Sequence, residues 1–350
     1  MKKKTFHLIS LGCAKNTVDS TSMAGRLMQA GYLFTDNPKQ AEVLIVNTCG
    51  FIKPAREEAI QTLQQLSEIK RSGQYLIAAG CMAERFSDQI TSSCPKVDGV
   101  LGTRHIMDIM TLIGNLKKRI NAPNPVFTTT IPENYSQFAV QGGSAYLKIA
   151  DGCSRRCAFC SIPLIKGNWK SRPVVDILKD AQSLQDMGIQ ELILIAQDTT
   201  AYGQDRGEMD ALPSLIEKIL QAAPKIPWLR ILYAFPGFVS DRLIDLMASN
   251  PTVLSYLDIP LQHAHPAVLK RMLRPDDMGW VRETIHKMRE RIPGIAIRST
   301  FITGFPGETE EEFMVLHDFL TEMKFDRVGV FPYYLEEGTS SAALGITVPE

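Results

Sequence analysis

The 350-residue chain has no excess of either charge, because 38 Lys and Arg residues balance 38 Asp and Glu residues. A protein that holds nucleic acid mainly through its overall field is expected to be basic. The balance therefore argues against such binding, although it leaves room for a local basic patch. The length is that of two domains, and the 45% hydrophobic content is ordinary for globular proteins.

Long apolar segments are also missing. No uncharged run approaches the roughly 20 residues of a membrane-spanning helix. The basic residues 2–4 resemble the head of a secretory signal, but the apolar stretch that follows is too short. The seven cysteines lack the even number that is typical of a disulfide framework. We therefore expect reduced thiols in a cytoplasmic protein with no membrane partner.

Three of the cysteines are concentrated in the run CSRRCAFC, as Cys153, Cys157 and Cys160. A loop that turns all three thiols toward one point is suited to a thiophilic group. Zinc would normally require a fourth protein ligand, and no further Cys or His is close in sequence. Three thiolates fit a four-iron cluster whose remaining iron is open to a substrate or cofactor. The alternative is three unrelated buried thiols.

The first part of the chain repeats an apolar run, and three of its four runs end in a cysteine. The runs cover residues 6–13, 42–49, 74–81 and 97–103, with helical stretches at 19–30 and 53–71 between them. Continuous apolar runs are typical of strands buried on both faces of a parallel sheet. The pattern predicts a doubly wound α/β domain.

Cys13, Cys49 and Cys81 end the first three runs, at separations of 36 and 32 residues. Each separation is about one βαβ unit, so the three thiols should lie side by side at the carboxyl edge of the sheet, where such sheets bind ligands. The alternative is that they are buried strand-end cysteines. Cys94 lies in a loop with no strand before it, and we interpret it as structural.

The second part alternates again. Strands are expected at residues 145–150, 191–196, 229–234, 253–259, 295–302 and 327–332, with helices such as 174–187 and 308–323 between them. Six βα units are too few for a closed eight-stranded barrel and indicate an open, partial (β/α)6 TIM-like barrel. We expect an N-terminal domain at 1–120, a linker at 121–143 that is rich in Pro and Gly, and the barrel at 144–350.

These motifs resemble the radical S-adenosylmethionine (SAM) methylthiotransferases. The CxxxCxxC run with Phe159 before its last Cys is the radical SAM signature, and SRP (171–173), LDIPLQH (257–263), KRMLRP (270–275) and TFITGFPGET (300–309) match as well. The resemblance implies that Cys153, Cys157 and Cys160 hold a 4Fe-4S cluster that binds SAM. It also implies that Cys13, Cys49 and Cys81 hold an auxiliary 4Fe-4S cluster. No catalytic residue beyond these ligands is expected.

One branch of this family modifies a tRNA adenosine, and another modifies an aspartate of ribosomal protein S-twelve. The motifs SLGCAKN (10–16), VDS (18–20) and QDTTAYG (197–203) resemble the second branch. This implies insertion of sulfur and a methyl group at the aspartate β-carbon, with SAM as radical source and methyl donor. The implied partners are S-twelve in the ribosome, an electron donor such as flavodoxin or ferredoxin, and a sulfur source. The chain is expected to act as a monomer.

The resemblance also suggests a SAM pocket. Phe159 is expected beside the adenine, and Gln197, Asp198, Gln262 and the strand end at 300–306, which includes Phe305, are expected to line it. Arg298, Lys148 or Arg172 is expected to pair with the SAM carboxylate, although an ion pair within the protein explains each equally well. We interpret His263 and His265 as structural or substrate-lining.

The family normally continues into a small C-terminal β-barrel, the TRAM domain, and this chain is expected to lack it because its residues stop near the point where that barrel begins. Two other functions remain open. The first alternative to the S-twelve branch is a tRNA adenosine methylthiotransferase of the same family. The second is a non-catalytic iron–sulfur electron carrier, which would not cleave SAM. A zinc or disulfide protein is a more distant alternative.

Overall fold

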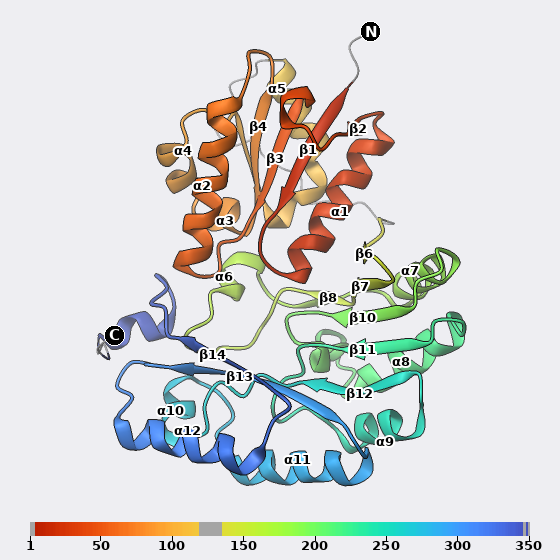
Figure 1. Cartoon of the computed structure of the whole chain (residues 1–350), viewed down its shortest axis with the longest axis vertical. Helices are drawn as coiled ribbons and strands as arrows, with labels where there is room; N and C mark the ends of the chain where they lie inside the picture. The colour runs from red at the N-terminus through yellow and green to blue at the C-terminus, as the bar shows by residue number, and fades with distance from the viewer. Residues whose placement is uncertain (1–3, 119–134, 346–347, 349–350) are drawn as a thin grey trace. The chain divides into compact units, whose positions relative to one another are not determined.

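The computed structural model describes residues 4–118, 135–345 and 348. The chain forms two compact units. The first contains Met1–Ala139 and Leu164–Lys166, and the second contains Val140–Pro163 and Gly167–Glu350. Figure 1 labels most of the helices and strands of the two units, which are described separately below.

A five-stranded parallel sheet in the order β2-β1-β3-β4-β5 forms the centre of the first unit. Its strands are β1 (Thr5–Ser10), β2 (Leu33–Phe34), β3 (Val43–Thr48), β4 (Tyr75–Gly80) and β5 (Gly99–Gly102). All six residues of β3 are buried, as expected for a strand that is covered on both faces. The strands β1, β3 and β4 are neighbours, so their carboxyl ends meet at one edge of the sheet.

Helices pack on both sides of this sheet (Figure 1). They are α1 (Ala14–Gln29), α2 (Lys53–Ile69), α3 (Cys81–Arg85), α4 (Ser87–Ser93) and α5 (Ile109–Lys117). Val43 and Ile45 of β3 belong to the core with α1 and α5, whereas Leu44 and Val46 belong to the core with α2 and α4. This alternation is what a strand between two helical layers requires, and it confirms the expected doubly wound domain.

The second unit contains a seven-stranded sheet in the order β14-β13-β12-β11-β10-β7-β6. Its six parallel strands are β7 (Ser144–Lys148), β10 (Glu191–Ile195), β11 (Trp228–Ile231), β12 (Val253–Asp258), β13 (Ala296–Thr303) and β14 (Arg327–Pro332). β14 and β6 (Phe138–Gln141) are the edges of the sheet, so the barrel is open. The expected six βα units and the partial barrel are confirmed.

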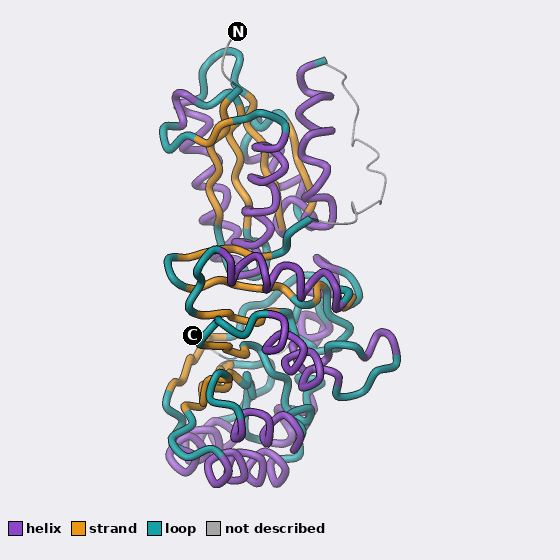
Figure 2. The backbone as a smooth tube through the Cα atoms, turned by 90° about the vertical axis from the view of Figure 1, so that its right-hand side faces the viewer, coloured by secondary structure: helices purple, strands orange, loops and turns teal. Residues whose placement is uncertain are grey.

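Helices lie along the outer side of this curved sheet (Figures 1 and 2). They are α7 (Val174–Asp186), α8 (Ala211–Ala222), α9 (Asp241–Ser249), α10 (Pro266–Arg271), α11 (Met278–Arg291) and α12 (Glu310–Met323). The short strands β8 (Ala150–Asp151) and β9 (Lys170–Ser171) pair with each other. Between them lies α6 (Ile162–Lys166), whose residues Leu164–Lys166 belong to the first unit.

Some details differ from the sequence-based expectations. Helix α1 begins at Ala14, five residues before the expected start. Strand β11 ends at Ile231, before the expected end at residue 234, because Tyr233 adopts a positive φ of 63° that a strand does not accommodate. Of the expected linker, residues 121–134 lie outside the described residues, and the remainder contains β6. In the part of the chain that the structure describes, no helix is long and apolar enough to cross a membrane.

Candidate metal centres

The loops that carry Cys13, Cys49 and Cys81 are in contact within the first unit. Cys13 precedes α1, Cys49 follows β3, and Cys81 opens α3. A methyl group on Gly12 would lie 3.1 Å from Sγ of Cys49, and one on Gly50 would lie 2.9 Å from the carbonyl carbon of Cys81. Glycine at both positions allows the three loops to approach this closely. The structure therefore brings together the three cysteines that the sequence grouped by spacing.

The thiols of this group affect one another electrostatically. Burial, helped by the charges of Asp19, Cys13 and Cys49 and opposed by Lys166, raises the pKa of Cys81 to about 12. Burial also raises the pKa of the Cys49 thiol. Buried thiols of this kind give up their protons when a positively charged metal replaces them. The donor set therefore fits a thiophilic metal group.

Among the described residues, no three His, Cys, Asp or Glu side chains are close enough to ligate one metal ion. The ligand geometry of a four-iron cluster is different, because each thiolate binds a different iron and the sulfurs need not converge on a single atom.

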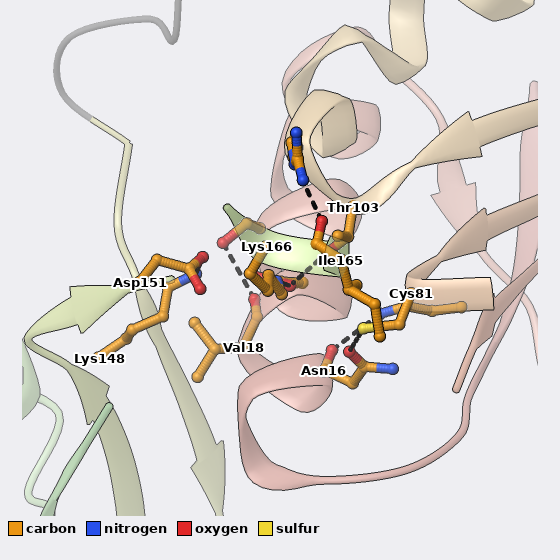
Figure 3. A network of polar contacts seen from close by, with 12 residues as sticks. Asn16, Val18, Cys81, Thr103, Lys148, Asp151, Ile165 and Lys166 are labelled. Atoms are coloured by element: carbon orange, nitrogen blue, oxygen red, sulfur yellow. Dashed lines mark hydrogen bonds and ion pairs between the residues drawn. The ribbon is translucent and has the colours of Figure 1, made fainter. Parts of the chain in front are cut away.

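A buried ion pair lies beside Cys81 in the first unit (Figure 3). Nζ of Lys166 is 2.7 Å from Oδ2 of Asp19, and the two side chains are only 3% and 5% exposed. The Thr103 hydroxyl donates to the same carboxylate oxygen over 3.4 Å. The Cys81 thiol donates to Oδ1 of Asn16 over 3.3 Å. A cation, an anion and an amide thus surround one of the three thiols.

The backbone on either side of Lys166 is held in the same unit. The Arg104 guanidinium donates to the carbonyl oxygens of Ile165 and Leu164, both over 2.9 Å. Arg104 also lies 3.5 Å from the carboxylate of Glu84 in α3. The Lys166 side chain is therefore positioned both by its own ion pair and by its backbone.

In the second unit, Cys153, Cys157 and Cys160 lie in the loop between β8 and α6. The Cys160 N–H donates to the Cys157 carbonyl over 3.0 Å, and the Cys153 N–H donates to the Gly167 carbonyl over 3.0 Å. Burial, helped by the neighbouring Cys157 and Cys153 and opposed by Arg274, raises the pKa of Cys160 to about 12. These three thiols are thus also gathered by the fold.

Two arginines that the sequence analysis did not assign contact this loop or its surroundings. Nη1 of Arg274 lies 3.6 Å from Sγ of Cys157, and its guanidinium stacks 4.1 Å from the ring centre of Phe235. Nε of Arg155 donates to Asp198 over 2.9 Å, and its guanidinium lies 4.3 Å from the same ring. The motif KRMLRP contained the signal for Arg274.

The residues expected in the SAM pocket occupy different environments. Phe159 is partly buried and packs on a core cluster that includes Phe305, which has no exposed surface. Gln197 follows β10 and is partly buried, while Asp198 is buried and accepts the Thr200 hydroxyl over 2.6 Å. Phe305 is therefore a core residue, whereas Phe159 and Gln197 retain accessible surface.

The other expected pocket residues lie on the sheet. Gln262 has a positive φ of 76°, donates its N–H to the Thr300 carbonyl and accepts the Ile302 N–H, both over 2.8 Å. Arg298 lies 3.1 Å from Asp258 and its side chain is 40% exposed. Phe301 packs on Phe319 of α12, so the alternating Arg298 faces the opposite, inner side of the sheet.

The remaining candidates are buried in contacts with other protein groups. Lys148 and Arg172 form ion pairs with Asp151 over 2.9 Å and with Asp180 over 2.7 Å. His263 is fully buried, with Nε2 3.2 Å from Glu308 and Nδ1 accepting the N–H of His265. Lys148, Arg172 and His263 are thus engaged with other groups of the protein, whereas the His265 side chain is 30% exposed.

The class of the protein follows from the fold, the cysteine loop and the family models. Residues 147–320 match the radical SAM superfamily, and residues 5–102 match a family described as uncharacterized protein family UPF0004. The open barrel with a three-cysteine loop is thus that of a radical SAM enzyme. A structure of the methyltransferase TsrM from Kitasatospora setae has a TM-score of 0.70 over 97% of this chain and 77% of its own, at 14% identity, which supports the fold alone.

Full-length relatives define the family more narrowly. Proteins from Roseiflexus sp. (strain RS-1) and Chloroflexus aurantiacus are each 44% identical to this chain over 99% and 97% of its length, and 78% of each relative is covered. A protein from Herpetosiphon aurantiacus is 42% identical over 99% of the chain and 80% of its own length. All three are named ribosomal protein uS12 methylthiotransferase RimO, and this chain belongs to that family.

Proposed function

We propose that this chain inserts a sulfur atom and a methyl group at the β-carbon of an aspartate in ribosomal protein uS12. Relatives that are 42–44% identical over almost the whole chain carry the name of this activity. The observation that carries the proposal is that each compact unit gathers its own group of three cysteines. An electron carrier would need no barrel of this kind.

Cys153, Cys157 and Cys160 would hold one 4Fe-4S cluster, and Cys13, Cys49 and Cys81 would hold the other. Held by Cys153, Cys157 and Cys160 and with SAM bound, the first cluster would supply radical chemistry able to remove hydrogen from an unactivated carbon. No side chain could remove that hydrogen as a base at neutral pH. The second cluster and a second SAM would supply sulfur and the methyl group.

The chain's own residues would bind and orient SAM. We assign Phe159 to the adenine because it is partly exposed and adjoins Cys160. Gln197, Asp198 and Gln262 lie at or beyond the carboxyl ends of barrel strands, where barrel enzymes bind their substrates. Of the basic candidates, we assign Arg298 to the SAM carboxylate, since it faces the inner side of the sheet and is partly exposed.

The reaction would take place in the cytoplasm, where ribosomes are assembled. It would need an electron donor such as flavodoxin or ferredoxin and a source of sulfur, and the chain would act as a monomer. The alternative acceptor is tRNA, and the motif QDTTAYG together with the balanced charge favours the protein acceptor.

The first test is to reconstitute the chain without oxygen and to count iron and acid-labile sulfide. The wild type is compared with Cys153/Cys157/Cys160→Ala and with Cys13/Cys49/Cys81→Ala. We expect two four-iron clusters in the wild type and one in each variant, with SAM cleavage only in the variant that keeps Cys153, Cys157 and Cys160. A single cluster in the wild type would mean that the N-terminal cysteines are packing residues.

The acceptor is tested separately by incubating the reconstituted wild type with uS12 and with bulk tRNA. Mass spectrometry should find a gain of one methylthio group on an aspartate of uS12. A methylthio group on tRNA adenosine and none on uS12 would establish the alternative branch.

A further inference from the structure

Arg274 is a buried cation whose position in the second unit is set by contacts on several sides. Its side chain is 9% exposed, and Nη1 lies 3.6 Å from Sγ of Cys157. Nη2 donates to the Pro260 carbonyl, and the guanidinium stacks on Phe235. Through these contacts Arg274 bridges the cysteine loop, the end of β12 and an aromatic ring.

No carboxylate among the described residues forms an ion pair with Arg274, and its Nε has no hydrogen-bond partner there. A buried charge without a counter-charge is costly, and buried charges are normally paired. The Cys157 thiol, 3.6 Å from Nη1, is a group in contact with this cation that can carry a negative charge. The guanidinium therefore lies next to a thiol and keeps one donor, Nε, without a partner among the described residues. Both features suit a cation that faces an anionic sulfur site.

The backbone before Arg274 has the form that directs this side chain toward the loop. Helix α10 ends at Arg271, the Leu273 N–H donates to the Lys270 carbonyl, and the Arg274 N–H donates to the Leu269 carbonyl. These two bonds are those of a Schellman cap. Its left-handed position is occupied by Leu273, with φ of 53° and a half-exposed side chain, where glycine is usual.

The same segment also holds the cysteine loop directly. The Ala158 N–H, between Cys157 and Cys160, donates to the carbonyl of Met272 over 2.8 Å. The segment thus holds the loop through the Met272 carbonyl and places the Arg274 cation at a thiol, so it acts on both the geometry and the charge of the site.

We propose that Arg274 is a positioning residue for the cluster of Cys153, Cys157 and Cys160, to which it donates a hydrogen bond at the Cys157 sulfur and supplies a compensating positive charge. The inference rests on the proposed function, since it requires a cluster at these cysteines. Hydrogen bonds to the sulfurs and nearby charge tune the potentials of iron–sulfur clusters. Reduction adds negative charge, so Arg274 should make the cluster easier to reduce.

The test uses the full chain with Cys13/Cys49/Cys81→Ala, so that only one cluster contributes to the signal. The midpoint potential is measured by electron paramagnetic resonance during a redox titration of this parent and of Arg274→Met and Arg274→Lys. In Arg274→Met the equilibrium constant for reduction should fall about tenfold, a shift of about 59 mV for one electron. Arg274→Lys should shift less, because it keeps the charge but loses the planar fork.

The matched control is Arg271→Met, which removes a cation from the same segment. Arg271 is paired with Glu312 over 2.6 Å and has no contact with the cysteines among the described residues. Its removal should leave the potential unchanged. Equal potentials in the parent and in both Arg274 variants would overturn the inference while the proposed function stands.

Two other outcomes are distinguishable. If Arg274→Met does not bind iron, the test rests on the midpoint potential and the spectrum of Arg274→Lys. An unchanged potential and spectrum in Arg274→Lys would then overturn the inference. A parent that binds no four-iron cluster would overturn the proposed function, and this inference with it.

Discussion

Replacing Lys166 with Met should destabilise the first unit, because it removes the ammonium that pairs with the buried Asp19 carboxylate. The two charged atoms are 2.7 Å apart and both side chains are at least 95% buried. Met fills a similar volume but carries no charge. The Thr103 hydroxyl still donates to Asp19, but a neutral donor does not replace the ammonium.

The expected loss follows from the degree of burial. Breaking a buried pair by removing one partner costs about 3–5 kcal/mol, since the remaining charge is uncompensated. Replacing both partners with uncharged groups often changes the free energy of unfolding very little. The double variant Asp19→Asn/Lys166→Met should therefore recover most of the loss, and a double-mutant cycle should give a coupling of about 2 kcal/mol or more.

Hydrogen exchange of the intact chain, followed by mass spectrometry of peptides, reports the two units separately. Protected amides of α1 and β4 should exchange about two to three orders of magnitude faster in Lys166→Met, as 1.4 kcal/mol corresponds to a factor of ten. All three tryptophans, Trp169, Trp228 and Trp280, belong to the second unit. Their fluorescence transition in urea should stay unchanged.

The control is Lys53→Met, which breaks an exposed pair with Glu57 whose side chains are 70% and 66% exposed. It should change stability by less than about 0.5 kcal/mol. If exchange in α1 and β4 of Lys166→Met stays within about threefold of the wild type, which is under about 0.7 kcal/mol, the buried pair does not stabilise this unit and the reasoning is refuted.

Three further variants test other parts of the structure. Gly50→Ala should lower the free energy of unfolding by about 1–3 kcal/mol and reduce iron loading of the first unit, because its methyl group would lie 2.7 Å from a backbone nitrogen of α3. The control is Gly25→Ala in α1, whose methyl group would meet no atom within 4 Å. It should raise the free energy of unfolding by about 0.5–1 kcal/mol. Leu273→Gly should stabilise the second unit in urea by up to about 1 kcal/mol, since glycine tolerates the left-handed cap, and an equal loss would contradict this. The Arg271 hydrogen bond lowers the pKa of Glu312, so this pair adds stability above the unfolded pKa that is lost as pH falls through the folded pKa. Glu312→Gln should therefore lower urea stability at neutral pH, and the difference should shrink in acid; a loss independent of pH would refute the linkage.

Much of the fold could be predicted because its signals are local. The helix expected at 53–71 is observed as Lys53–Ile69, since apolar residues at helical spacing mark the buried face directly. The start of α1 was missed because Lys15 and Asn16 are polar yet buried. Asn16 donates to the carbonyls of Leu11 and Thr48, so its burial depends on contacts with loops that lie outside its own helix.

The two groups of three cysteines could be recognised from their spacing, because a CxxxCxxC loop and three neighbouring strand ends each bring thiols together for geometric reasons. The charged residues around these thiols could not be predicted from spacing. Arg274 is 117 residues from Cys157, and Lys166 is 147 residues from Asp19. Nothing in either local sequence indicates which distant acid or thiol the cation will meet.

The sequence by itself determined the two α/β units, the two groups of thiols and the family resemblance, since strand and helix periods and ligand spacing are properties of short segments. Only the tertiary structure decided that Phe305 is core, that Lys148 and Arg172 form buried ion pairs, and that Arg274 is a buried cation without a carboxylate partner among the described residues. The physical reason is that the cost of burying a charge depends on what surrounds it in space. Those surroundings are assembled from segments that are far apart in the chain.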